Sequence, residues 1–148
     1  MKRSLLVEAA GGPLAVVIAG ANVHDTKLLA ATLDAIVVER PHPSLERPQH
    51  LCLDLGYDNP TGAAAVTSHH YVAHLRRIGK EKLDLATGEQ RFPARRWVVE
   101  RTLAWLSKCR ALLIRYDKHA ANFLALVQFG CALLWFRRLQ RLPGPGAG

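Results

Sequence analysis

The sequence is short of acidic residues. Its 148 residues include 12 Asp and Glu against 20 Lys and Arg, which gives a formal net charge of +8 and an isoelectric point near 9.9. A domain with this excess of cations attracts polyanions, of which nucleic acid is the most common, although ribosomal and membrane-surface proteins share the trait. The composition therefore favours contact with nucleic acid.

Cysteine is also scarce. The three cysteines, Cys52, Cys109 and Cys131, form no Cys-x-x-Cys pair and no zinc-finger spacing. Each lies in or beside an apolar run, which predicts small buried hydrophobic side chains. An odd number of cysteines fits a reducing compartment.

The sequence contains no convincing export signal or membrane span. Glu8 and residues 11–13 (Gly-Gly-Pro) interrupt the apolar N-terminus, which favours a β-hairpin over a signal peptide. The apolar stretch 120–140 is interrupted by Asn122, Gln128 and Gly130 and is predicted to be a buried core helix. We therefore expect a cytoplasmic protein of one domain without membrane contact.

Hydrophobic periodicity and turn signals predict a mixed α/β fold in the order strand, strand, helix, strand, helix, strand, helix, helix. The predicted elements span residues 4–8, 14–19, 25–37, 50–54, 62–68, 71–75, 94–109 and 120–140. Asp25 is the expected cap of the first helix, and Asn59-Pro60 the start of the second. We expect a domain over residues 1–141 and a disordered tail over 142–148.

Two carboxylates stand where an acid is unexpected. Asp54 ends an apolar strand just before Gly56, and ligand sites in α/β sheets favour the carboxyl ends of strands. Glu100 lies in a helix, at the edge of a broad apolar face. Each also has a structural interpretation, a turn at Gly56 for Asp54 and an ion pair with Arg96 for Glu100. Together the two acids could hold a hard divalent cation.

Three blocks of the sequence resemble the C-terminal half of bacterial insertion-sequence transposases of the DDE type. The blocks are GPLAVVIAGANVHDTKLL, LDLGYDN and the long segment that begins RRWVVERTLAWLSKCR. The group is often called insertion sequence family five, or the four-like transposase domain. The similarity runs in matching order from about Leu5 to Leu139.

This resemblance implies an RNase H-like catalytic core with a mixed sheet flanked by helices, in which Asp, Asp and Glu hold two Mg²⁺ ions, with Mn²⁺ as an alternative. Asp54 matches the second Asp, and Glu100 matches the Glu. The apolar and aromatic face behind Glu100 would then fix its helix on the sheet. The family places a Tyr before the first Arg of this block and a Lys or Arg after the Glu. Here those positions hold Pro93 and Ser107, with Lys108 next to it.

No residue of this chain matches the family's first Asp, and Glu8 lies in a different strand. The resemblance therefore implies a C-terminal fragment or downstream reading frame that lacks the first strand of the sheet and is not expected to cut DNA alone. The exposed sheet edge could pair with another chain. Expected partners are element ends, target DNA, a second copy and an upstream transposase fragment.

The basic residues near these blocks are the expected DNA contacts: Arg76, Arg77, Arg95, Arg96, Arg101 and Lys108. A second hypothesis from the same residues is a non-catalytic DNA-binding module that inhibits the full transposase through mixed oligomers. A structural RNA-associated protein is a third hypothesis. The sequence indicates a turn role for Asp58 and leaves His24 unexplained.

Overall fold

The computed structural model describes residues 1–75 and 96–141. Its elements are β1 (Lys2–Val7), β2 (Pro13–Ala19), α1 (Asp25–Asp34), β3 (Gln49–Leu53), η1 (Leu55–Tyr57), α2 (Pro60–Ser68), β4 (Tyr71–Leu75), α4 (Arg96–Ser107), α5 (Arg110–Leu113) and α6 (Ala120–Leu139). The predicted order of strands and helices is confirmed within these ranges. The two shortest helices, η1 and α5, were not predicted.

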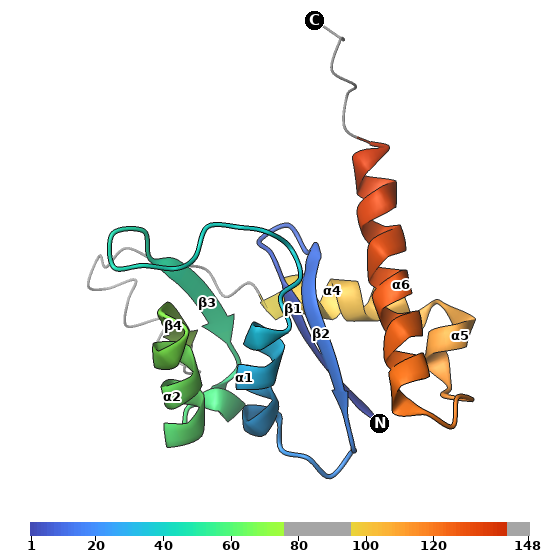
Figure 1. Ribbon diagram of the computed structural model, residues 1–148, viewed down its shortest axis with the longest axis horizontal. Coiled ribbons are helices and arrows are strands. Elements are labelled where there is room, and N and C mark those ends of the chain that lie inside the picture. Colours follow the sequence, from blue (N-terminus) through green and yellow to red (C-terminus); the bar gives the residue numbers. More distant parts are fainter. Residues whose placement is uncertain (76–95, 142–148) are drawn as a thin grey trace, which may run out of the picture.

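The β1–β2 hairpin lies in the middle of the fold (Figure 1). Its strands pair antiparallel. The turn between them is held by Glu8, whose carboxylate oxygens accept hydrogen bonds from the backbone amides of Ala10 (2.8 Å) and Gly12 (2.7 Å). Gly11 in the same turn has a φ of 91°, which a residue with a Cβ rarely adopts. The predicted hairpin is therefore confirmed.

The strands β3 and β4 form a second sheet, which is parallel, with Leu51 beside Ala73. The connection between them runs through α2, because parallel strands need a crossover. The side-chain oxygen of Asn59 accepts a hydrogen bond from the amide of Gly62 at 3.0 Å and thereby caps α2. Pro60 occupies the first turn, where a missing N–H costs little. The predicted Asn-Pro helix start is confirmed.

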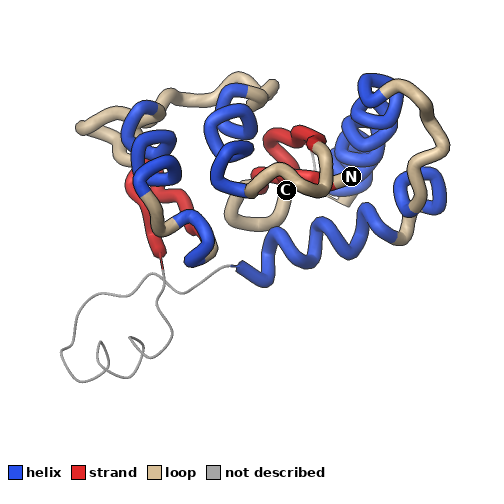
Figure 2. Tube along the Cα trace, turned by 90° about the horizontal axis from the view of Figure 1, so that it is seen from below, coloured by secondary structure: helices blue, strands red, loops and turns tan. Residues whose placement is uncertain are grey.

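The elements lie in a row (Figures 1 and 2). The β3–β4 sheet and α2 occupy one end, α1 comes next, then the hairpin, and α6 stands at the other end. In Figure 1, α4 passes behind the hairpin on its way to α5. The hairpin therefore has helices on both of its faces.

One face of the hairpin packs against the C-terminal helices. The buried core on this side consists of Val16, Leu106, Leu112, Phe123, Val127 and Cys131. Leu106 and Val127 are completely buried. Val98 and Thr102, two turns and one turn before Leu106 on α4, are buried on the same face, as the helical spacing predicts.

The other face of the hairpin packs against α1, which also covers the β3–β4 sheet. The second core consists of Leu29, Leu33, Leu51, Ala65 and Val66, with Leu6 at its edge. The hydroxyl of Thr32 donates to the hydroxyl oxygen of Ser4 at 2.8 Å and ties α1 to β1. The helix α1 therefore sets the position of β3 relative to the hairpin.

The mixed α/β class is confirmed, but a single mixed sheet is not formed. The described strands make two separate pairs, β1–β2 and β3–β4. No described strand joins β1 to β3, and both pairs pack their apolar side chains around α1 instead. The described strands therefore form two small sheets bridged by a helix, and the RNase H-like sheet stays a prediction.

The helix α6 is less buried than its composition predicts. Its buried residues are Phe123, Val127, Gly130, Cys131 and Leu134. Its exposed large hydrophobic residues are Leu126, Phe129, Leu133, Phe136 and Leu139. The prediction of a buried core helix holds for one face only, because the other described elements pack on that face.

By length and composition α6 is long and apolar enough to cross a membrane, a test that core helices of soluble proteins also pass.

Two further predictions, the end of the first helix and the burial of Cys52, are wrong. The first helix ends at Asp34 rather than near Val37, which is 82% exposed. Cys131 is buried and Cys109 is half-buried, but Cys52 is exposed, because it alternates with the buried Leu51 along β3.

Candidate active site

Asp54 follows the last residue of β3 and begins the short helix η1. Its Oδ1 accepts a hydrogen bond from the amide of Leu55 at 2.8 Å. The side chain is exposed. It stands at the carboxyl end of a parallel sheet, the edge at which α/β proteins place ligands. The turn role is thus observed, and the position also suits a ligand site.

Tyr57 belongs to the same edge, although the sequence patterns assigned it no role. Burial raises the pKa of its phenol, and the negative charges of Asp25 and Asp54 raise that pKa further. The helix α1 also contacts η1, the turn to which Tyr57 belongs. Tyr57 lies inside the LDLGYDN block, and this position could have indicated that it belongs to the site. Its proximity to Asp25 follows only from the fold.

His24 is the cap of α1. Its Nδ1 accepts a hydrogen bond from the amide of Thr26 at 3.4 Å and lies 2.8 Å from the hydroxyl oxygen of that residue. Asp25 occupies the first turn instead and forms an ion pair with Lys2 at 3.0 Å. The prediction that Asp25 caps this helix is wrong, because His24 is the cap and Asp25 is the first residue within the helix.

Glu100 is exposed on α4, with Val98 buried on the opposite side, which agrees with its predicted place off the middle of the apolar face. Trp97 is also exposed, by 56%, and the guanidinium carbon of Arg101 lies 4.9 Å from its ring centroid. Trp105 packs against the core. The expectation that the apolar and aromatic face anchors α4 therefore holds for Trp105, whereas Trp97 was not part of that predicted face.

Asp54 and Glu100 are the predicted metal ligands. Carboxylate oxygens suit a hard cation such as Mg²⁺, which proteins often hold through one or two carboxylates while waters and substrate phosphates complete its coordination. No group of three or more His, Cys, Asp or Glu side chains among the described residues is placed to hold a metal ion. The described residues therefore show no metal site, and metal binding by Asp54 and Glu100 stays a prediction.

Several of the predicted DNA contacts cannot be placed. Arg76, Arg77 and Arg95 lie outside the described residues. Arg96 is the first residue of α4, and its side chain also lies outside the described part of the chain. The predicted ion pair between Arg96 and Glu100 stays a prediction for the same reason.

The other two predicted contacts, Arg101 and Lys108, are both exposed. Arg101 donates from Nη2 to the carbonyl oxygen of Ala10 at 2.7 Å and so reaches the hairpin turn. Lys108 follows the end of α4 and is exposed. The predicted contacts did not include the arginines near the end of α6, which approach α4 through the fold.

The comparisons with known proteins agree with the resemblance in the sequence. The family model for the transposase DDE domain matches residues 1–135. The chain is also 35% identical over 143 residues to an inferred transposase for insertion sequence element IS402 from Burkholderia cepacia. That alignment covers 95% of this chain and 64% of the relative. No solved structure matches the chain.

These matches define the class as proteins with a transposase DDE domain. The chain belongs to the transposase DDE-domain family. The resemblance seen in the blocks around Asp54 and Glu100 is thereby confirmed, and the chain spans 64% of the length of the relative that it matches.

Proposed function

We propose that this chain acts as part of a transposase in the transposition of an insertion sequence, a reaction that proceeds by metal-dependent cleavage and joining of DNA strands. Asp54 and Glu100 are the proposed catalytic carboxylates. The observation that carries the proposal is the family match, because residues 1–135 include both acids. The activity of a whole transposase is part of the proposal, since the chain corresponds to 64% of its relative.

In this proposal Asp54 and Glu100 hold Mg²⁺ or Mn²⁺, with two ions in the complete enzyme. A bound ion of this kind activates the attacking oxygen and stabilises the leaving oxygen of a phosphodiester. The chain keeps both carboxylates on ordered elements. Leu55 orients Asp54 through its amide, and Thr102 fixes α4 by donating to the carbonyl oxygen of Gly11 at 2.8 Å.

The RNase H-like architecture is also part of the proposal. In the assembled enzyme the β1–β2 and β3–β4 pairs would belong to one sheet. Two contacts of α1 support this: its Thr32 reaches Ser4 on β1, and its Leu29 and Leu33 share a core with Leu51 on β3. Both pairs of strands therefore pack against the same helix, α1.

The proposed DNA contacts are Arg76, Arg77, Arg95, Arg96, Arg101 and Lys108. The net charge of +8 supports binding to DNA, since cations that neutralise phosphates release condensed counterions. The proposed place of action is the bacterial cytoplasm, at the nucleoid. A second copy or another transposase segment is the proposed protein partner.

A transposition assay tests the catalytic roles. The complete genetic element that carries this coding sequence is introduced into cells, and its excision is compared for the wild type, Asp54→Asn and Glu100→Gln. Each substitution keeps the shape of the side chain and removes its charge. Both variants should reduce excision by about three orders of magnitude or more. Asp58→Asn is the matched control, because Asp58 lies four residues after Asp54 in the same block and should be dispensable.

Metal binding supplies a second readout on the purified chain. Electron paramagnetic resonance of Mn²⁺ should detect weak binding that the Asp54→Asn and Glu100→Gln variants lose. Unchanged Mn²⁺ binding and unchanged excision in both variants would overturn the catalytic assignment.

The alternative is a non-catalytic DNA-binding or inhibitory module derived from a transposase. Its supporting observation is the basic charge, which includes four arginines that line one hollow near α6. Under this alternative Asp54→Asn and Glu100→Gln leave function intact, whereas removal of exposed arginines abolishes it. The same set of variants therefore separates the two functions.

A further inference from the structure

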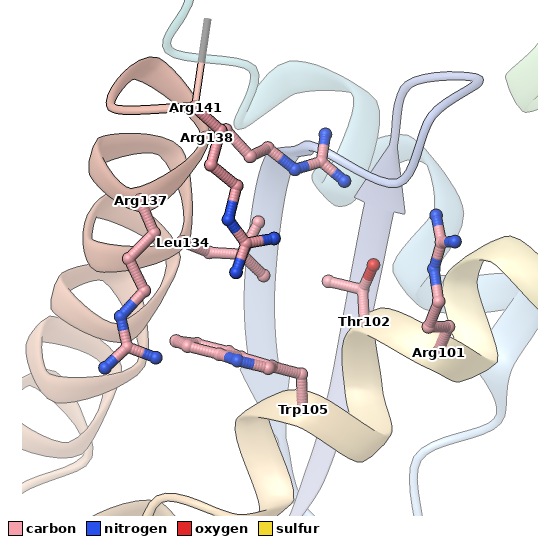
Figure 3. A pocket seen from close by; sticks show the side chains of 7 residues that line it. All are labelled: Arg101, Thr102, Trp105, Leu134, Arg137, Arg138 and Arg141. Atoms are coloured by element: carbon pink, nitrogen blue, oxygen red, sulfur yellow. The ribbon is translucent and has the colours of Figure 1, made fainter.

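A hollow lined by arginines lies between α4 and α6, close to the hairpin turn. Its volume is about 330 Å³, and it is open to solvent. The residues that line it are Arg101, Thr102, Trp105, Leu134, Arg137, Arg138 and Arg141. Figure 3 shows the side chains of Arg137, Arg138 and Arg141 approaching from α6 and its end, and those of Arg101, Thr102 and Trp105 from α4.

Two of these arginines are held in place by the hairpin turn. Arg138 donates from Nη1 to Glu8 at 2.9 Å and from Nη2 to the carbonyl oxygen of Ala10 at 2.7 Å. Arg101 donates to the same carbonyl oxygen at 2.7 Å. Because a guanidinium carries five N–H donors, both arginines retain donors for a ligand. Two helices thus present pre-positioned guanidinium groups to one space.

The charge of this hollow is not balanced by the described residues. Glu8 pairs with Arg138 and offsets one positive charge. The lining itself contains no acidic side chain among the described residues, so Arg101, Arg137 and Arg141 contribute three further positive charges. A site with this chemistry attracts an anion that accepts hydrogen bonds from guanidinium groups, which is the geometry of phosphate recognition.

Trp105 gives the hollow an aromatic wall. The guanidinium carbon of Arg137 lies 5.5 Å from the centroid of the Trp105 ring. Unpaired nucleic-acid bases stack on indole rings and on the planes of guanidinium groups, and their phosphates bind to neighbouring arginines. A paired base in a duplex lies inside the stack and does not offer its face to such a wall.

We infer that the hollow between α4 and α6 binds an unpaired nucleotide of single-stranded DNA, with its phosphate at the arginines and its base against Trp105. The lining of the hollow includes neither Asp54 nor Glu100, and the inference does not depend on their catalytic role. It gives a function to Arg137 and Arg141, which were not among the DNA contacts predicted from the transposase blocks.

Fluorescence anisotropy with the full chain tests the assignment. The probe is a labelled single-stranded oligodeoxynucleotide of about 15 nucleotides, compared with a duplex of the same length. The variant Arg137→Ala/Arg141→Ala removes two cations that make no described hydrogen bond to the fold. It should weaken single-strand binding about tenfold and lower the slope of log affinity against log salt by roughly 1 to 2.

The matched control is Lys27→Ala/Arg47→Ala, which removes two cations at exposed positions on α1 and in the loop before β3. It should bind the single strand like the wild type. Equal losses in the two double variants would assign the effect to net charge and overturn the inference. Unchanged binding of Arg137→Ala/Arg141→Ala would overturn it as well, and so would an equal loss of duplex binding in that variant.

Tryptophan fluorescence tests the base contact. A deoxynucleoside monophosphate should quench the wild type, and Trp105→Phe should lose most of this quenching while circular dichroism confirms its fold. Inorganic phosphate should compete with the labelled strand less well than the nucleotide. If inorganic phosphate competes equally well, or quenching persists in Trp105→Phe, the hollow is a phosphate site without base recognition and the assignment to single-stranded DNA fails.

Asp54→Asn/Glu100→Gln separates this inference from the proposed catalytic function. Without divalent metal, this variant should bind the single strand like the wild type. Loss of binding in this variant would show that the strand lies at the carboxylates and would overturn the inference for the hollow.

Discussion

Arg138 near the end of α6 forms an ion pair with Glu8 in the hairpin turn, with 2.9 Å between Nη1 and Oε1. The two residues are 130 positions apart in the sequence. Arg138 and Arg101 both donate to the carbonyl oxygen of Ala10, one residue before the Gly11 carbonyl that binds α4 through Thr102. The hairpin turn is therefore the point at which α4 and α6 are joined.

Removal of the Glu8 charge should destabilise this junction. Glu8→Gln is expected to lower the free energy of unfolding by about 1 kcal/mol at neutral pH, a modest value because solvent screens the partly exposed pair. Chemical denaturation of both proteins measures the difference. As a control, Glu39→Gln removes an exposed carboxylate elsewhere and should change stability by less than about 0.5 kcal/mol.

The effect of Glu8→Gln should depend on pH. Burial by itself raises the pKa of Glu8, but hydrogen bonds from the amides of Ala10 and Gly12 and from Arg138 outweigh it, so the pKa lies below 4.5. A carboxyl group with a lowered pKa in the folded state stabilises the fold above about pH 4.5 and loses that effect as the pH falls through the folded value. The two proteins should therefore converge as the pH falls below the folded pKa of Glu8. A difference that persists there would contradict this assignment.

His69 should stabilise the contact between α1 and α2 in its protonated form. Its Nε2 lies 2.8 Å from Oδ1 of Asp34, and its Nδ1 lies 2.7 Å from the carbonyl oxygen of Ala65. Both neighbours accept hydrogen bonds, and only the imidazolium has two donors to offer. The hydrogen bond to Asp34 is the main reason that the pKa of His69 lies above 6.5, although burial opposes it.

A raised pKa gives stability that is fully present below about pH 6.5 and is lost as the pH rises through the folded value. Asp34→Asn should therefore destabilise the protein at about pH 5.5 and much less at about pH 9. Nuclear magnetic resonance titration of His69 in both proteins measures the cause directly, since its pKa should fall in the variant. An unchanged pKa of His69 in the variant would show that Asp34 does not raise it.

Gly12 should not tolerate a side chain. A Cβ at this position would lie 2.3 Å from Cζ2 of Trp135, whose ring is held by a hydrogen bond from Nε1 to the carbonyl oxygen of Pro13 at 2.7 Å. Gly12→Ala should lower the free energy of unfolding by about 1 to 3 kcal/mol. Gly56→Ala is the control, because a Cβ there would meet no atom within 4 Å and the change should be nearly neutral. Thermal denaturation compares the two, and equal melting temperatures would refute the steric argument.

Leu106 should dominate the packing of α4. The side chain is fully buried in the core beneath the hairpin, whereas Leu113 on the neighbouring α5 is 61% exposed. Leu106→Ala should cost about 2 to 5 kcal/mol because it leaves a cavity, and Leu113→Ala should cost less than about 0.5 kcal/mol. Denaturant titration measures both, and similar costs for the two substitutions would contradict the assigned core.

By itself the sequence determined the local structure and the family. Asn59-Pro60 starts α2, and the glycines of the first turn close the hairpin, because these residues restrict backbone dihedrals and hydrogen bonding over a few positions. The blocks around Asp54 and Glu100 were sufficient to predict the transposase family, and the 3.6-residue spacing predicted that Glu100 would lie at the edge of the apolar face of its helix.

Only the tertiary structure decided which distant side chains meet. The ion pair of Glu8 with Arg138, the contact of His69 with Asp34 and the arginine-lined hollow beside Trp105 all join residues far apart in the chain. It also decided that the strands form two pairs around α1 and that one face of α6 stays exposed. These features depend on how whole elements pack, and local periodicity describes the faces of an element without specifying which element will cover them.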